Sequence, residues 1–204
     1  MARPRKNTKE PSAKERIYQA FWAELEEVEY RKITVGSVVA RAGVNRNSFY
    51  YHFDCLPDLA HVCIQEQLPK ELFQVLLTDG PYDAIVYGAA RRSVHMEERL
   101  GHLRLAAGVQ GSGELAMYVR DEIARFWLQG FGLEWEQLDQ PERFTIRFLT
   151  GGIVAMLGEL SRENALPQLL EYLESPFFQA ASSAGVKMLK DVRARVNGPS
   201  GLHA

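Results

Sequence analysis

Long apolar runs are missing from this chain: no stretch approaches the roughly 20 consecutive apolar residues that a membrane-spanning helix requires. The basic N-terminus has no apolar stretch behind it, so we expect no secretory signal. Cysteine is also scarce, and Cys55 and Cys63 would lie about two turns apart on one helix, too far for a disulfide. Two reduced thiols are typical of a cytoplasmic protein.

The sequence patterns of common enzymes are absent too. There is no glycine-rich phosphate loop, no His-Glu-x-x-His motif and no Gly-x-Ser-x-Gly elbow. His52, Cys55, His61 and Cys63 lie near one another in the sequence but lack the paired spacing of a zinc site. We therefore expect a protein that is not an enzyme and holds no metal or cofactor, with a catalytic C-terminal domain as the rival class.

Charge is distributed unevenly, although the net charge of the whole chain is only −2. Residues 1–53 hold ten Lys and Arg against six Glu, a net +4. Residues 54–204 hold the other fourteen basic and twenty acidic residues, a net −6. A basic head on an acidic body suits a module that binds a polyanion, attached to a part that does not. Ordinary scatter of charge is the alternative explanation.

Hydrophobic periodicity predicts helices throughout and gives little sign of strands, so the expected fold class is all-α. The first helix is expected to begin after Ser12, which forms the capping-box pattern with Glu15. Its apolar positions recur on one face, at Ile17, Phe21, Leu25 and Val28. Beyond the N-terminal region, helices are expected at about 57–68, 81–94, 97–108, 114–130, 141–163 and 166–195, the last interrupted at Ser175-Pro176.

Residues 33–53 have the outline of a helix-turn-helix, two short amphipathic helices that meet at a glycine. Thr34 is expected to cap the first of them, and Gly43 to end it in the left-handed conformation. Asn45 is expected to cap the second, over residues 46–53, with Phe49 and Phe53 facing inward. The three N-terminal helices would then form one small domain.

The polar side chains of residues 46–52 are candidates for DNA contact. Arg46 suits a bidentate contact with guanine, and Asn47 suits adenine. The remaining hydroxyl and imidazole groups can reach phosphates or base edges, and Thr34 begins a helix whose free amides suit a phosphate. For Tyr51, packing against its own domain is an equal alternative. The candidate DNA-binding residues are Thr34, Arg46, Asn47, Ser48, Tyr50, Tyr51 and His52.

This segment resembles the DNA-binding domain of the TetR/AcrR family of transcriptional regulators. The resemblance covers about residues 13–62 and rests on the order of the first apolar helix, Thr34-Val35, Ala42-Gly43-Val44 and the aromatic cluster 49–53. It implies DNA-contacting positions at six of the candidates, all except Tyr51. The family carries a small polar residue and a lysine at the next helix start, where this chain has Cys55-Leu56. The basic arm of Arg3, Arg5, Lys6 and Lys9 either replaces that contact or is a solvated tail.

The resemblance implies a ligand-responsive homodimeric regulator, a repressor released from a palindromic operator by a largely apolar small molecule. The expected domains are residues 1–53 for DNA binding, 54–198 for ligand binding and dimerisation, and 199–204 as a flexible tail. Small residues at Gly151, Ala155 and Gly158 suit a helix at the dimer interface, with intramolecular packing as the alternative. A second stripe for this interface is Phe177, Ala181, Ala184, Met188 and Val192.

The ligand site is less evident from the sequence. His102 and Trp127 are the candidate ligand-binding residues, within a domain rich in aromatic side chains. A basic cluster is a possible anchor for an anionic group, or else part of the solvated surface. It comprises Arg91, Arg92, His95, Arg99, His102 and Arg104.

Overall fold

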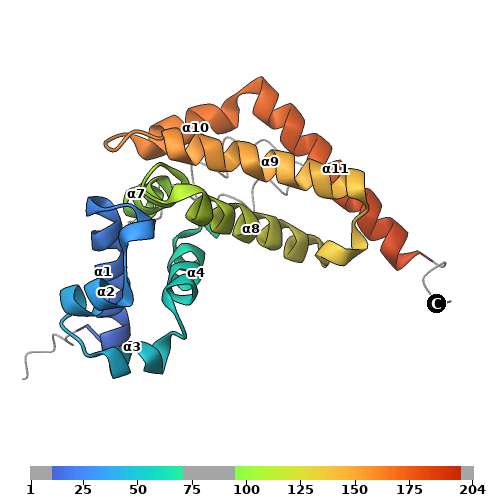
Figure 1. Ribbon diagram of the computed structural model, residues 1–204. Helices are drawn as coiled ribbons and strands as arrows, with labels where there is room; N and C mark the ends of the chain where they lie inside the picture. Colours follow the sequence, from blue (N-terminus) through green and yellow to red (C-terminus); the bar gives the residue numbers. More distant parts are fainter. Residues whose placement is uncertain (1–10, 71–94, 199–204) are drawn as a thin grey trace, which may run out of the picture. The chain divides into compact units, whose positions relative to one another are not determined.

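The computed structural model describes residues 11–70 and 95–198 (Figure 1), and the regular secondary structure within these ranges is helical, without a strand. The all-α expectation is therefore confirmed for the described chain. The expected helix at 81–94, the basic arm and the 199–204 tail lie outside the described residues. None of the described helices has both the length and the apolar character needed to cross a membrane.

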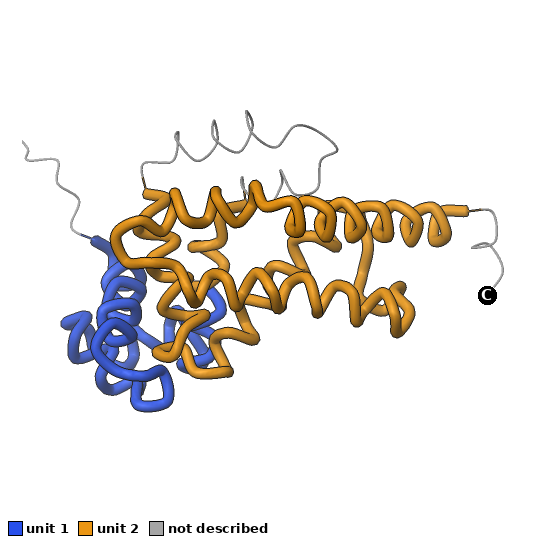
Figure 2. The backbone as a smooth tube through the Cα atoms, turned by 90° about the horizontal axis from the view of Figure 1, so that it is seen from above, with its two compact units in different colours: residues 1–63 blue, residues 64–204 orange. Residues whose placement is uncertain are grey.

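The chain divides into two compact units, residues 1–63 and residues 64–204 (Figure 2). The first unit continues past Phe53 to Cys63, whose carbonyl accepts from the Tyr18 hydroxyl at 3.4 Å. Cys55 is exposed, Cys63 is buried, and neither forms a disulfide. The helices that begin in this unit are α1 (Ala13–Glu27), η1 (Tyr30–Lys32), α2 (Val35–Ala42), α3 (Arg46–His52) and α4 (Leu56–Gln67).

The first unit has its core on the predicted apolar stripe of α1. Ile17, Phe21 and Leu25 are completely buried, and α1 begins with the predicted capping box between Ser12 and Glu15. The helix ends at Glu27, since Val28 already has extended backbone angles. Removal of these three side chains from water contributes to the stability of the unit.

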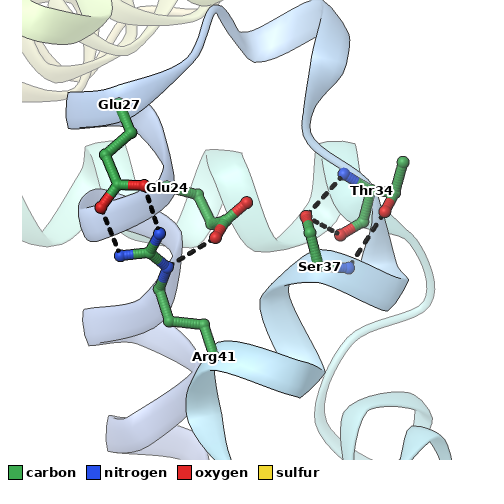
Figure 3. Close-up of polar contacts among 5 residues, drawn as sticks. All are labelled: Glu24, Glu27, Thr34, Ser37 and Arg41. Atoms are coloured by element: carbon green, nitrogen blue, oxygen red, sulfur yellow. Dashed lines mark hydrogen bonds and ion pairs between the residues drawn. The ribbon is translucent and has the colours of Figure 1, made fainter.

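An ion-pair cluster joins α1 to α2 at the surface (Figure 3). Arg41 Nε lies 2.5 Å from Glu24 Oε1, and its terminal nitrogens donate to both carboxylate oxygens of Glu27 at 2.9 and 2.6 Å. These hydrogen bonds lower the pKa of Glu27 and raise that of Arg41. The bidentate geometry fixes the guanidinium direction.

The second unit is built from five described α-helices and one short 3-10 turn. The predicted interruption at Ser175-Pro176 is confirmed, because Ser175 caps α11 and Pro176 is its first residue. Gly158 allows α9 to approach the end of α7, since a Cβ built there would lie 3.1 Å from the Ala107 carbonyl oxygen. The helices are α7 (Met96–Ala107), α8 (Ser112–Phe131), η2 (Trp135–Gln137), α9 (Gln140–Glu159), α10 (Ala165–Glu174) and α11 (Pro176–Asn197).

One ion pair joins the start of α9 to the last turns of α11. The Arg195 guanidinium donates to the two carboxylate oxygens of Glu142 at 2.7 and 2.9 Å. Glu142 also accepts from the Asp139 amide at 2.8 Å. The bonds from Arg195, and then the bond from Asp139, lower the pKa of Glu142 against the opposing effect of burial.

Glu142→Gln is expected to lower the free energy of unfolding at neutral pH, with a difference that shrinks in acid. Because the pKa of Glu142 is lowered in the folded state, its contribution is complete above the unfolded value of about 4.3 and is lost as the pH falls through the folded value. Urea unfolding of wild type and variant at about pH 7 and about pH 4 measures the difference in unfolding free energy at each pH. Glu163→Gln, in the exposed connection before α10, is the control; a difference independent of pH would contradict the assignment.

Candidate functional site

The start of α2 is fixed by reciprocal hydrogen bonds between Thr34 and Ser37 (Figure 3). The Ser37 amide donates to Thr34 Oγ1 at 3.0 Å, and the Thr34 amide donates to Ser37 Oγ at 3.2 Å. Thr34 is exposed and has extended backbone angles, as an N-cap requires. A hydroxyl that accepts one hydrogen bond can still donate its own hydrogen, so the Thr34 hydroxyl suits a phosphate oxygen.

The turn after α2 sets the direction of α3. Gly43 has φ 62° and ψ 37°, the left-handed conformation predicted for it. Its amide donates to the Ala40 carbonyl at 3.3 Å, and the Val44 amide donates to Val39 at 3.1 Å. These bonds close the end of α2 before the chain reverses.

The inner side of α3 is held by aromatic side chains. Asn45 caps the helix by accepting from the Ser48 amide at 2.8 Å. Phe49 has no exposed surface and Phe53 is 2% exposed, and their ring centroids lie 5.6 Å apart. The predicted inward orientation of both phenylalanines is confirmed, so the rotation of α3 about its axis is fixed by packing.

The outer side of α3 presents polar and aromatic groups to solvent. Tyr51 is 84% exposed and Tyr50 is 55% exposed. The described contact of Tyr51 within its own domain is an edge contact with the His52 ring, 4.9 Å between centroids, and it leaves most of the side chain in solvent. Arg46 and Asn47 are exposed, while Ser48 and His52 are half-buried. The structure thus brings six of the seven candidate residues together on one short helix, with Thr34 at the start of α2.

Arg46 lies closer to α2 than the sequence indicated. A Cβ built on Gly36 would be 3.4 Å from Arg46 Nη2 and 3.5 Å from Thr34 Oγ1. The guanidinium therefore lies beside the first turn of α2, next to the threonine hydroxyl and the free amides of the helix. Cation, hydroxyl and helix amides together suit a phosphate better than a base edge.

The start of α4 is acidic where the TetR/AcrR pattern has an amine. Asp58 accepts from the Asp54 amide at 3.0 Å, and Cys55 is exposed beside it. The Asp58 carboxylate accepts a hydrogen bond from a backbone amide at the start of α4, and its negative charge repels phosphate. The described residues thus offer no replacement for that lysine at this point of the chain.

The second unit contains a pocket of about 450 Å³ between α8, α9 and α11. Trp127 lines this pocket, whereas His102, half-buried on α7, does not. Arg99 of the basic cluster donates to the carbonyl oxygens of Gln67, at 3.2 Å, and Leu68. Arg99 thus satisfies carbonyl groups at the end of α4. Arg91 and Arg92 of the same cluster lie outside the described residues.

The small residues on one face of α9 differ in their surroundings: some pack against another helix and others are open to solvent. Gly158 packs against α7, whereas Ala155 is exposed and a Cβ built on Gly151 would have no atom within 4 Å. On α11, Val192 is buried, but Phe177 is 76% exposed and Ala184 is exposed. Much of the predicted dimer surface is thus open to solvent in the single chain.

No protein-family model matches this chain, and no curated protein matches it. The solved structures that resemble it at a distance include the following two. One is the fatty acid degradation regulator FadR from Bacillus halodurans, at 13% identity and a TM-score of 0.44. The other is AlkX, a TetR family repressor from Dietzia sp. strain DQ12-45-1b implicated in biodegradation of n-alkanes, at 15% identity and a TM-score of 0.35.

Each likeness covers 89% of this chain and 96% of the other. With TM-scores below 0.5, both are distant.

Sequence reasoning missed two features of the surface. Gly36 was not singled out, although a glycine in the first turn of a capped helix can mark the close approach of another group. Phe144 and Phe148 are 70% and 61% exposed, and their rings stack at 6.4 Å. Their spacing of four residues on α9 was the available signal.

Proposed function

We propose that this protein is a DNA-binding transcriptional regulator, a repressor that a small molecule releases from its operator. The outer surface of α3 carries the proposal: a helix of seven residues presents polar and aromatic side chains while Phe49 anchors its other side. A helix exposed in this way fits the major groove of B-DNA. The likeness of residues 13–62 to TetR/AcrR regulators supports the same function.

In this proposal, different residues recognise the bases and bind the phosphates. Asn47, Tyr50 and Tyr51 lie on the outer surface of α3 and would meet base edges or the adjoining backbone. Arg46 and Thr34, beside the free amides of α2, would bind a phosphate. The phosphate contact would set the position of α3, and Asn47 would discriminate among sequences.

A homodimer would place two α3 helices on one face of a palindromic site, about 34–36 Å apart. Its proposed interface is the exposed apolar surface of α9 and α11, which includes Phe144, Phe148 and Phe177. Exposed aromatic side chains on adjacent helices are unusual for a monomer and typical of a helix-bundle interface. Sedimentation should detect a dimer that Phe144→Asp disrupts.

Two rival classes predict different results. A helical interaction module without DNA affinity would show no salt-dependent binding to duplex DNA, whereas a regulator loses affinity steeply with salt. An enzyme would turn over a small-molecule substrate and would likewise need no affinity for duplex DNA. Binding to random-sequence duplexes followed by selection therefore separates these classes first.

Asn47→Ala and Arg46→Ala should weaken operator binding in different ways. Loss of the Asn47 amide should cost about 1–3 kcal/mol on the selected operator and relax the preference at one base pair. Loss of Arg46 should weaken all sequences about equally and reduce the salt slope by about one. Fluorescence anisotropy over a salt series measures both quantities.

Arg162→Ala is the matched control for charge, because Arg162 is exposed in the connection after α9. It should leave the affinity and the salt slope unchanged. If Arg162→Ala and Arg46→Ala weaken binding equally, α3 is not the DNA-contacting helix. If no compound that binds residues 64–204 alters operator affinity, the regulatory half of the proposal fails and the DNA-binding half stands.

A further inference from the structure

A second hollow of the second unit lies between α8, α9 and the connection that joins these two helices. Its volume of about 410 Å³ falls in the usual range of roughly 300–1,000 Å³ for small-molecule sites. It shares a single lining residue, Arg147, with the pocket beside Trp127. The exposed phenylalanines of the proposed dimer surface, Phe144, Phe148 and Phe177, do not line it. This hollow therefore lies outside the surface assigned to a second copy.

Hydrogen bonds from α9 fix the wall that the α8–α9 connection, residues 132–139, gives to the hollow. Arg143 donates to the carbonyl oxygens of Trp135 and Glu136, both at 3.3 Å. Leu133 of the same connection is 2% exposed, so its side chain anchors the wall from inside. A wall that is already in place lowers the entropic cost of binding a ligand.

The floor of the hollow is apolar. Ala124 and Leu128 of α8 line it beside Leu133, and the three are 8%, 5% and 2% exposed. The Trp135 ring adds an aromatic side wall. An apolar side chain of a ligand would lose its contact with water on this floor, which favours binding.

The charged side chains of the lining sum to zero. They are three arginines and three acidic residues, Arg120, Arg125, Arg147, Asp121, Glu134 and Glu136. Two of the arginines are already paired, Arg120 with Asp121 at 2.8 Å and Arg125 with the buried Glu122 at 2.7 Å. Adding the neighbours Glu122 and Arg143 leaves the sum at zero. An occupant without net charge is therefore favoured.

Two opposite charges of the lining have no ion-pair partner among the described residues, Arg147 and Glu136. The guanidinium carbon of Arg147 lies 5.3 Å from the centroid of the Trp135 ring, and that ring lines the hollow. The cation is thus held at the wall. Glu136 is exposed at the same wall, whereas the Glu134 carboxylate is bonded to the Gln137 amide. A molecule with both signs of charge could pair with both.

We propose that this hollow binds a zwitterion, an α-amino acid with an apolar or aromatic side chain. Its carboxylate pairs with Arg147, since a guanidinium stacked on a ring keeps its N–H edge for a carboxylate. Its ammonium pairs with Glu136, and its side chain lies on Leu128 and Leu133. An ion of one sign would meet a like charge here, which disfavours it. The binding does not rest on the proposed function.

Three probes with the same phenyl ring test the two charges. L-Phenylalanine has both, 3-phenylpropionate lacks the ammonium, and 2-phenylethylamine lacks the carboxylate. At neutral pH, full-length protein should bind the amino acid about five- to fiftyfold more tightly than either analogue, between the values for a partly exposed ion pair and for a hydrogen bond to a charged group. Titration of the indole ¹H–¹⁵N signal that Trp135→Phe removes measures each affinity.

Two neutral substitutions separate the roles. Arg147→Gln should weaken binding of the amino acid and of 3-phenylpropionate about five- to fiftyfold, and leave 2-phenylethylamine within about twofold. Glu136→Gln should weaken the amino acid and 2-phenylethylamine by a similar factor and spare 3-phenylpropionate. Arg162→Gln and Glu163→Gln are the matched controls, because both residues are exposed in the connection after α9 and do not line the hollow. Melting temperatures check that all variants fold.

Equal affinity for the three probes, or no binding of any of them, would overturn the proposal. An equal loss of all three probes in either folded variant would overturn it too, since each charge is assigned to one group of the ligand. Operator binding by the same wild-type protein is measured in parallel. Failure of the probes with operator binding intact rejects this inference alone, whereas amino-acid binding without operator binding rejects the proposed function and leaves this site.

Discussion

Phe49→Ala is expected to unfold the first compact unit and to abolish DNA binding while the second unit stays folded. Phe49 has no exposed surface, and its ring contacts those of Tyr50 and Phe53 at centroid distances of 5.4 and 5.6 Å. Truncation of a buried phenylalanine costs about 3–5 kcal/mol. A unit of some 60 residues has little stability beyond that amount. Amide hydrogen exchange should report lost protection in α1 and α2 and retained protection in α8 and α9.

Tyr51→Ala is the matched control from the same helix. Its side chain is 84% exposed, so truncation should change the unfolding free energy by no more than about 0.5 kcal/mol. It should still weaken operator binding if the outer surface of α3 meets DNA. Similar loss of protection in both variants would mean that α3 is not anchored through Phe49.

Gly111→Ala is expected to destabilise the second unit by about 3 kcal/mol, the upper part of the range for overpacking. A Cβ on Gly111 would overlap the carbonyl group of Ala106 and lie 2.9 Å from its Cα. These are backbone atoms near the end of α7, so relief requires the α7–α8 connection itself to move. For a chain of this size the melting temperature should fall by about 6–12 °C.

Gly113→Ala provides the comparison two residues further on. Gly113 is exposed in the first turn of α8, and a Cβ built there would have no atom within 4 Å. Alanine should therefore stabilise the helix by about 0.5–1 kcal/mol. Thermal unfolding of both variants measures the contrast, and a loss of stability at both positions would show that Gly111 is not sterically special.

The helix-turn-helix could be predicted from the sequence because its determinants are local. The caps at Ser12, Thr34 and Asn45 act on amides within three residues, and the conformation of Gly43 follows from the absence of a Cβ. The inward position of Phe49 follows from helical periodicity. Each of these features is read from a few consecutive residues.

The remaining features depend on helices far apart in the chain. Arg46 was expected to face a base, but its position beside Gly36 depends on the crossing of α2 and α3. The pocket around Trp127 requires α8, α9 and α11 together. The ion pair of Arg195 with Glu142 spans 53 positions, and no periodicity in the sequence reports such a distance.

Arg41 contributes to the +4 charge of residues 1–53, yet its charge is offset by two neighbouring carboxylates. Glu24 and Glu27 both form ion pairs with Arg41, so the three side chains together bear a net charge of −1. A duplex that approached the α1–α2 surface would be repelled there, and the cation of Arg46 lies at the opposite end of α2. In the proposed complex with DNA, the acidic pair would favour one docking orientation of the small domain over its reverse.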